Sequence, residues 1–315
     1  MNTIPNRQVV CETLLAQAKE DKDIFVLTSD SRGSAAMAPF ADTFPEQFVE
    51  VGIAEQNIVG IASGLAHSGK KPFVTSPACF LSMRSIEQIK VDVAYSNTNV
   101  KLVGISGGIS YGALGMSHHS VQDFAVTRAI PNLTVLTPCD RFETKKMIEA
   151  LLHYPQGSYI RIGRNPVEDV HSSDDFPFEI GKAIQLADGD DVTIIACGEM
   201  VRIALDTSAL LQHSNINCRV INMHTLKPLD TDIIIRAAKE TGQIMTLEEH
   251  SIFGGLGAAV AEVICQRHPV PMKILGIPDE PAISGTTKEV FQHYGLDAQS
   301  LVNTIKQWLS NNAYG

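Results

Sequence analysis

The chain has 315 residues, more than one compact core of ordinary size holds, so two domains are expected. Its 35 acidic and 25 basic residues give a formal net charge of −10, and the basic residues are scattered singly, which argues against a nucleic-acid partner. No apolar run approaches the roughly 18 residues that a membrane-spanning helix needs, so no membrane span is expected.

The six cysteines show neither CxxC pairs nor the spacing of metal ligands, and they stand at positions 11, 79, 139, 197, 218 and 265. The stretch MNTIPNRQVV at the start has no apolar signal region. Both features are typical of a reduced, cytoplasmic protein, and no metal ligands are predicted on this chain.

Strands and helices alternate in the first half of the chain. Short runs rich in β-branched residues predict strands at 23–30, 71–76, 99–106, 133–138 and 158–163. Helical patterns separate most of these runs. Such alternation requires crossover connections, which predicts a parallel sheet.

Residues 163–181 are polar, turn-rich and without periodicity, which is typical of a linker. After them the alternation starts again, with strands predicted at 191–198, 217–226, 242–249 and 272–278. We therefore predict an α/β protein with two doubly wound, mostly parallel-sheet domains. The first domain covers residues 1–165 and the second covers residues 181–315, with a linker at 166–180.

One carboxylate stands near the start of a predicted helix. The stretch FVEVGIAEQNIVGIASGL at 48–65 reads as a strand followed by a helix of small residues. With the helix at about 53–66, Glu55 falls on the same face as Ile58 and Ala62, which points to the core. Glu55 is either a first-turn acid that complements the helix dipole, or a buried carboxylate that can pass a proton. The local pattern leaves both roles open.

Unusual residues follow the predicted strands, at the sheet edge where α/β proteins bind ligands. Asp30 and Ser34 follow the first strand, and the stretch SGGISYGALGMSHHS combines four glycines with His118 and His119. Glycines let a backbone approach a ligand closely, although a merely flexible loop would have the same composition. The adjacent histidines favour a site, and they lack the spacing and carboxylate neighbours of a metal cluster.

Four segments resemble, in order and spacing, the pyrimidine-binding and C-terminal domains of transketolases: FVEVGIAEQNIVGIASGLA, EQIKVDVAY, GGISYGALGMSHHSVQDFAVTRAIPNLTVLTPCD and LEEHSIFGGLGAAVAEV. The resemblance covers nearly the whole chain, and the length looks like that of the C-terminal subunit of a split transketolase. It implies a transferase of carbohydrate metabolism that uses thiamine diphosphate. Such an enzyme moves a two-carbon ketol unit from a ketose donor to an aldose acceptor.

The resemblance also implies roles for single residues. The family glutamate matching Glu55 bonds N1′ of the thiamine diphosphate aminopyrimidine, and an aromatic ring matching Phe80 packs on that pyrimidine. His118 matches a histidine that bonds substrate oxygens and helps to move protons, and Asp30 matches an acid beside the thiazolium ring. Glu55 and His118 are thus expected to be catalytic. A core role for Phe80 and a turn role for Asp30 are the alternatives.

Other family residues hold the terminal phosphate of the substrate, and Arg7, Ser34 and Arg164 match them, as suits guanidinium and hydroxyl donors. For each arginine, a solvated surface charge is the alternative. Two positions depart from the family. Leu114 stands where an aspartate reads a hydroxyl of the donor, and Ser106 stands where a histidine helps to grip phosphate. The departures imply a variant ketose, branched, deoxy or with a different anionic tail.

The family holds diphosphate and Mg²⁺ through a Gly-Asp-Gly motif followed by an asparagine, on an N-terminal domain without a counterpart here. The nearest imitation, GDD at 189–191, has the wrong third residue. The stretch GGLGAA at 254–259 looks like a phosphate loop, but in the family it begins a helix without a cofactor role. The resemblance therefore implies a partner subunit that carries Mg²⁺, in an α₂β₂ heterotetramer.

Two other functions stay open. The β subunit of a 2-oxoacid dehydrogenase E1 component shares both domains and the same glutamate, although SHHSVQDF and TLEEHSIFGGLG look closer to transketolases. A noncatalytic scaffold or regulatory subunit would share the fold. The presence of Glu55 and His118 argues against that third function.

Overall fold

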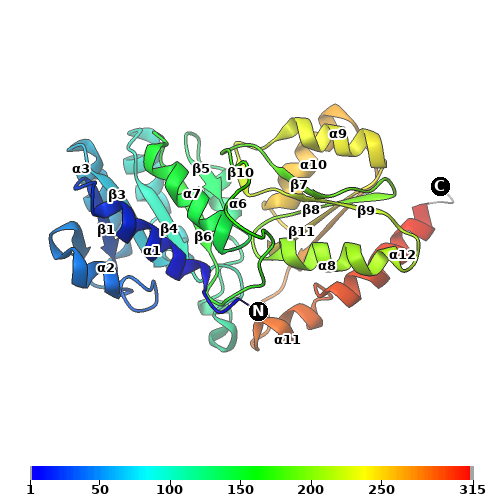
Figure 1. Cartoon of the computed structure of the whole chain (residues 1–315), viewed down its shortest axis with the longest axis horizontal. Coiled ribbons are helices and arrows are strands. Elements are labelled where there is room, and N and C mark those ends of the chain that lie inside the picture. The colour runs from blue at the N-terminus through cyan, green and yellow to red at the C-terminus, as the bar shows by residue number, and fades with distance from the viewer. Residues whose placement is uncertain (1, 313–315) are drawn as a thin grey trace.

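Two β-sheets lie side by side in the computed structural model, which describes residues 2–312 (Figure 1). Within these residues the first sheet has seven strands, in the order β10 (Thr225–Lys227), β5 (Thr134–Leu136), β6 (Ser158–Ile162), β4 (Lys101–Ile105), β3 (Lys71–Pro77), β1 (Ile24–Thr28) and β2 (Phe48–Glu50). The second has five, in the order β12 (Met272–Ile277), β11 (Ile244–Ser251), β8 (Val192–Ala196), β9 (Cys218–Asn222) and β7 (Ile184–Ala187). Neighbouring strands run parallel except in the pairs β10–β5 and β7–β9. The predicted α/β class with mostly parallel sheets is confirmed.

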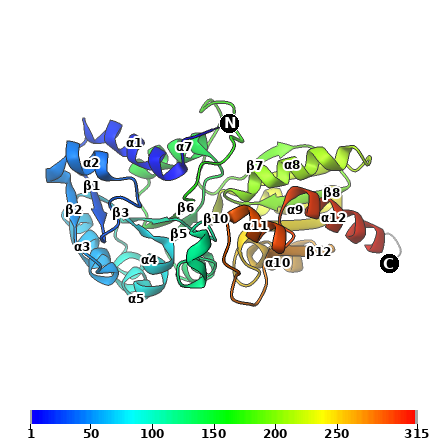
Figure 2. The same cartoon turned by 90° about the horizontal axis from the view of Figure 1, so that it is seen from below.

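Helices cover both faces of the first sheet (Figure 2). One face packs against α1 (Asn6–Ala18), α2 (Ala38–Thr43) and α7 (Arg141–His153). The other packs against α3 (Glu55–His67), the π-helical segment η2 (Ile89–Tyr95) and α6 (Asp123–Arg128). The shorter elements are η1 (Pro45–Gln47), α4 (Ala78–Arg84), α5 (Ile86–Gln88) and the 3₁₀ segment η3 (Gly112–Ser117).

The second sheet is covered in the same way. The helices α8 (Met200–Gln212), α11 (Thr287–His293) and α12 (Ala298–Asn312) pack on one face, and α9 (Thr231–Thr241) and α10 (Leu256–Arg267) on the other. Figure 1 shows α9 and α10 above this sheet and α8 and α12 below it. The sequence sets the ends of α9, because the Asp230 carboxylate accepts the N–H of Ile233 and the helix stops at Gly242, whose φ of +66° suits glycine.

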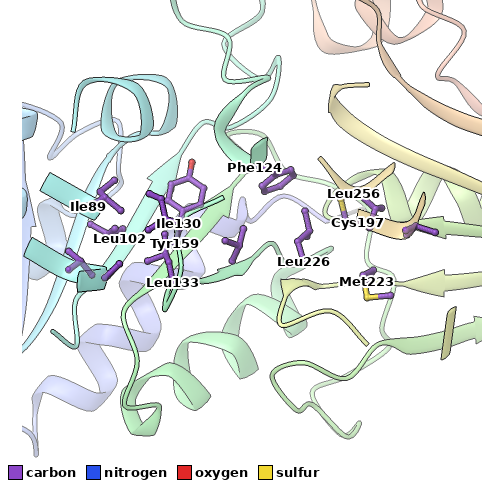
Figure 3. Packing of buried hydrophobic residues seen from close by; sticks show 14 of the residues in the cluster. Ile89, Leu102, Phe124, Ile130, Leu133, Tyr159, Cys197, Met223, Leu226 and Leu256 are labelled. Atoms are coloured by element: carbon purple, nitrogen blue, oxygen red, sulfur yellow. The ribbon is translucent and has the colours of Figure 1, made fainter. Parts of the chain in front are cut away.

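One of the hydrophobic clusters spans both sheets (Figure 3). Phe124 of α6 and Leu226 of β10 belong to the same cluster as Cys197 and Leu256 of the second half. β10 follows β9 along the chain but pairs with β5, so the run 217–226, predicted as one strand, forms two strands in different sheets. The edge strand β7 was not predicted, because its half-buried residues form no apolar run.

No helix within residues 2–312 is both long enough and apolar enough to cross a membrane.

Candidate active site

Glu55 is the first residue of α3, just after β2. Its side chain is 6% exposed and lies on the buried face of the helix with Ile58 and Ala62. Nη1 of Arg84 donates to Oε1 of Glu55 at 2.8 Å, and the Ser85 hydroxyl donates to the carbonyl oxygen of Glu55 at 2.6 Å. Among the described residues, no backbone N–H of α3 donates to the Glu55 carboxylate. Its contacts therefore favour a buried, ion-paired acid over a helix cap.

Aromatic rings connect this acid to the glycine-rich loop. Arg84 lies one helical turn after Phe80 in α4, and its Cζ is 4.2 Å from the centroid of the Phe80 ring. The Phe80 centroid lies 5.2 Å from that of His118, which in turn lies 5.3 Å from that of Tyr111, with the rings edge to face. The structure thus brings together Glu55, Phe80 and His118, which come from three separate segments.

A group of polar residues continues from Tyr111. Cζ of Arg164 lies 5.1 Å from the Tyr111 ring centroid, and Nε of Arg7 donates to the carbonyl oxygen of Arg164 at 3.1 Å. Nη1 of Arg7 donates to the carbonyl oxygen of Ser34 at 2.5 Å. Burial, followed by the positive charge of Arg164, lowers the pKa of Arg7. The three residues predicted to grip an anion therefore lie together, and two positive charges converge there.

The two positions that depart from the family lie in the same region. Ser106, at the end of β4, is buried with a φ of +56°, and its Oγ lies 3.5 Å from Nη1 of Arg164. Leu114 belongs to η3 and is 54% exposed. Its side chain offers no hydrogen-bond acceptor.

The adjacent histidines point to different surroundings. His119 is buried, its Nε2 lies 3.0 Å from the carbonyl oxygen of Gly112, and burial lowers its pKa. His118 is half-buried, with its Nδ1 3.0 Å from Oγ of Ser117 and its ring against Phe80 and Tyr111. Only His118 of the pair therefore stands among the candidate site residues.

Asp30 lies in an exposed turn after β1, with a φ of +52°. Its backbone N–H donates to Oε1 of Glu50 at 2.7 Å, and the Thr28 hydroxyl donates to Oε2 at 2.6 Å. Burial of Glu50 works to raise its pKa, but hydrogen bonds from Thr28, Asp30 and Gly52 hold that pKa below its ordinary value. No hydrogen bond in the described part of the chain joins the Asp30 side chain to Glu55, so these contacts support the turn role for Asp30.

A surface hollow of about 400 Å³ opens beside Glu55. Its lining consists of residues 53–57 and Arg84. Ile53, which lines the hollow, is more than half exposed and gives it an apolar edge. A planar ligand entering this hollow would meet the carboxylate of Glu55.

Two other candidate ligand sites already have hydrogen-bond partners within the protein. The N–H groups of Leu256 and Gly257, at the start of α10, both donate to the carboxylate of Glu248 at 2.7 Å, so GGLGAA has a packing role. Cys139, Asp140 and His171 come close enough to hold a metal ion. However, the Asp140 carboxylate already accepts three backbone N–H groups, from residues 143, 170 and 171.

Sequence reasoning missed Arg84 and Tyr111. Both lie close to or inside segments that carry the resemblance, and the spacing of four residues between Phe80 and Arg84 on one helix predicts that the two side chains meet. Tyr111 gave no such signal, because its partners His118 and Arg164 are fixed by the folding of the loop.

Two family models match the chain. The model described as transketolase, pyrimidine binding domain, matches residues 2–168, and the model described as transketolase, C-terminal domain, matches residues 181–301.

Individual relatives match over nearly their whole length. A protein of Phocaeicola vulgatus named as a subunit of apulose-4-phosphate transketolase is 50% identical over 308 residues, covering 98% of each chain. A protein of a Clostridium species named as a subunit of 6-deoxy-6-sulfo-D-fructose transketolase is 36% identical, covering 96% of this chain and 93% of its own. A solved structure described as a split gene transketolase, inactive beta4 tetramer, is 36% identical with a TM-score of 0.90, covering 98% of this chain and 99% of that one.

Proposed function

The chain belongs to the transketolase family, and we propose that it supplies the pyrimidine half of the active site in a split, thiamine-diphosphate-dependent enzyme. The observation that carries this proposal is the buried carboxylate of Glu55 beside an open hollow, with the rings of Phe80 and His118 next to it. These residues fit the pyrimidine end of the cofactor, since they offer an acid for N1′ and an aromatic face. When bound, the cofactor supplies the carbon nucleophile that attacks the ketose carbonyl.

Glu55 holds and moves the proton at N1′ of the aminopyrimidine. Arg84 bonds Oε1 of Glu55, which leaves Oε2 for the ligand. Water has little access to a side chain that is 6% exposed, so the proton passes to the ligand rather than to solvent. Phe80 orients the pyrimidine by ring packing, and its own position is fixed by Arg84 and His118.

His118 bonds the oxygens of the sugar and moves a proton at the reacting carbonyl or hydroxyl group. Its Nδ1 is paired with Oγ of Ser117, which leaves Nε2 for the substrate. The family role of Asp30, beside the thiazolium ring, is part of this proposal, and its exposed carboxylate is available to a ligand.

The anionic end of the sugar binds at Arg7, Arg164 and Ser34. The Arg7 guanidinium is held by two backbone carbonyl oxygens, and the Arg164 guanidinium lies over the Tyr111 ring. Two such groups, with the Ser34 hydroxyl nearby, are suited to a phosphate or sulfonate. Leu114 in place of an acceptor and Ser106 in place of a histidine point to a variant ketose. The names of two relatives, which refer to apulose 4-phosphate and to 6-deoxy-6-sulfofructose, support this substrate class.

The diphosphate and Mg²⁺ are held by a partner subunit of the N-terminal transketolase type. The exposed apolar residues support a surface that the partner covers: Ile53 in the hollow, Met83 next to Arg84 in α4, and Leu114 and Met116 in the loop. We further propose an α₂β₂ assembly in the cytoplasm, and a division into residues 1–165, the linker 166–180 and 181–315. The relative described as a β₄ tetramer supports self-association.

The decisive experiment mixes this chain with its N-terminal-type partner, thiamine diphosphate and Mg²⁺. We expect transfer of two-carbon units between sugars, which the comparisons favour over the E1 alternative. Release of CO₂ from 2-oxoacids without ketol transfer would show that the E1 alternative is correct instead.

A further inference from the structure

The loop that carries His118 has a closed base. We call residues 109–119 the His118 loop; it includes Tyr111 and Leu114. Its two ends meet in an isolated antiparallel bridge, where Gly108 N–H donates to Ser120 O at 3.0 Å and Ser120 N–H donates to Gly108 O at 2.7 Å. Because the bridge closes the loop at its base, the groups that hold the base also set the position of His118.

The strand β11 of the second sheet holds both ends of this base. Oε1 of Glu249 accepts the N–H of Ile109 at 2.8 Å. Two residues later along β11, the N–H of Ser251 donates to the carbonyl oxygen of Val121 at 2.8 Å. The strand β11 therefore bonds Ile109, which follows Gly108 of the bridge, and Val121, which follows Ser120.

The tip of the loop also contacts the C-terminal half. A Cβ added to Gly112 would lie 2.8 Å from the carbonyl oxygen of Gly285, and one added to Gly115 would lie 2.5 Å from Oγ of Ser284. Both glycines have positive φ, of +54° and +70°. The base and the tip are thus fitted against the same half of the molecule.

A buried charge network fixes Glu249 itself. Nη2 of Arg161 on β6 donates to the carbonyl oxygen of Glu249 and lies 3.6 Å from its Oε2. Nε of Arg161 lies 3.7 Å from Oδ2 of Asp123, which also accepts the hydroxyl of Tyr159 at 2.8 Å. Arg161, Glu249 and Asp123 are all less than a tenth exposed. A buried charge costs free energy unless it is paired, and Arg161 faces both carboxylates. Its bond to the Glu249 carbonyl oxygen fixes the backbone of Glu249 whatever the charge of that side chain.

The packing around the network requires the glycines at the start of the loop. A Cβ on Gly107 would lie 2.4 Å from Cγ and Nε of Arg161, and one on Gly108 would lie 2.2 Å from the carboxyl carbon of Glu249. These glycines therefore serve the contact between the two halves, in addition to any approach of a ligand.

From these contacts we infer that Glu249 is a positioning residue that orients His118, and that the C-terminal half thereby belongs to the active-site structure. Glu249 does so by accepting the Ile109 N–H while its other oxygen faces Arg161. The catalytic meaning of this inference rests on the proposed role of His118. The mechanical part, the anchoring of the loop, does not.

Two variants of Glu249 separate the effect of side-chain length from the effect of side-chain charge. Glu249→Gln keeps an acceptor at the right distance but loses the negative charge. Glu249→Asp keeps the charge but shortens the side chain by one methylene, which withdraws the acceptor from Ile109. Hydrogen–deuterium exchange of the full chain, without cofactor or partner, measures how firmly the loop is held. In residues 107–121 we expect the backbone amides to exchange about tenfold faster or more in Glu249→Asp, and at near the wild-type rate in Glu249→Gln.

Peptides from β8 report whether each variant is folded, and Glu240→Asp is the matched control, since Glu240 pairs with Arg219 on the surface of the same half. An unchanged exchange rate in Glu249→Asp, or an equal rise in both variants, would overturn the inference. In the assembled enzyme, kcat is expected to fall more than KM rises for Glu249→Asp. For Glu249→Gln, kcat is expected to stay close to the wild-type value. Because the exchange measurement needs no activity, failure of the proposed function would leave its result intact.

Discussion

Arg84 and Glu55 form an ion pair of 2.8 Å between Nη1 and Oε1 at the edge of the hollow. The carboxylate is buried and the guanidinium is half-exposed, so the pair joins the interior of α3 to the surface where a ligand enters. The same guanidinium covers the Phe80 ring. One arginine thus fixes both residues that are proposed to hold the aminopyrimidine.

The ion pair predicts the effect of replacing Arg84. Arg84→Met removes the partner of a buried carboxylate, and we expect the free energy of unfolding to fall by about 1 kcal/mol, a small value because Arg84 is partly solvated. Arg84→Lys should recover part of this loss, since an ammonium group restores the charge but not the planar contact with Phe80. Urea unfolding of the chain alone measures both variants. Equal stability of Arg84→Met and wild type would show that the ion pair contributes nothing.

Replacing Glu55 should remove activity and leave the structure intact. Glu55→Gln can still bond N1′ but cannot deliver a proton, so we expect turnover of the assembled enzyme to fall by roughly 100-fold or more. Exchange of the cofactor C2 proton for deuterium should slow in parallel. Glu46→Gln, at an exposed position, is the control and should change neither rate. Wild-type exchange in the Glu55 variant would reduce Glu55 to a structural residue.

Cofactor binding should require the partner subunit. This chain offers ligands for the pyrimidine end, and we propose that the partner holds the diphosphate and Mg²⁺. Titration calorimetry of the chain alone with thiamine diphosphate and Mg²⁺ is expected to show no binding at micromolar concentrations. Micromolar or tighter binding without a partner would contradict the divided site.

The loop residue Leu114 should decide which donor is used. A missing acceptor there leaves a hydroxyl of an ordinary ketose donor without its hydrogen-bond partner, at a cost of about 1 to 3 kcal/mol. Leu114→Asp is therefore expected to raise kcat/KM for xylulose 5-phosphate by roughly tenfold or more, and to lower it for the native sugar. Met116→Asp, which adds the same charge at an equally exposed position in the same segment, serves as control. If wild type already uses xylulose 5-phosphate as its best donor, the variant-substrate proposal is wrong.

Stability should depend on pH through Glu199, at the boundary between the two halves. Burial, and then the charge of Glu249, raises the pKa of Glu199 to about 8, while Arg161 works in the opposite direction. The folded chain therefore binds a proton that the unfolded chain releases near the ordinary glutamate pKa of 4.5. The stabilising contribution is complete below that value and disappears as pH rises through about 8.

Denaturant unfolding between about pH 5 and pH 9 checks this prediction. We expect the free energy of unfolding to fall less steeply with pH in Glu199→Gln than in wild type. Because the charge of Glu249 contributes to the raised pKa of Glu199, the difference between the two curves reports the interacting pair Glu199 and Glu249. Parallel curves would mean that Glu199 is ionised at neutral pH in the folded chain.

The sequence by itself determined the α/β class, the parallel sheets and the buried face of α3, because each depends on the periodicity of one segment. It also placed Glu55, Phe80 and His118 as candidates through the segments that resemble transketolases. Periodicity says which face of an element is buried, but not which neighbour covers it.

Contacts between distant segments were decided only by the tertiary structure. The residues 217–226 read as one strand, yet β10 leaves the second half to pair with β5. Local patterns do not distinguish His118 from His119, and only the fold of the loop turns one towards the rings and the other inward. The bond from Glu249 to Ile109 joins residues 140 positions apart, and no local pattern encodes it because its geometry depends on how two complete sheets pack together.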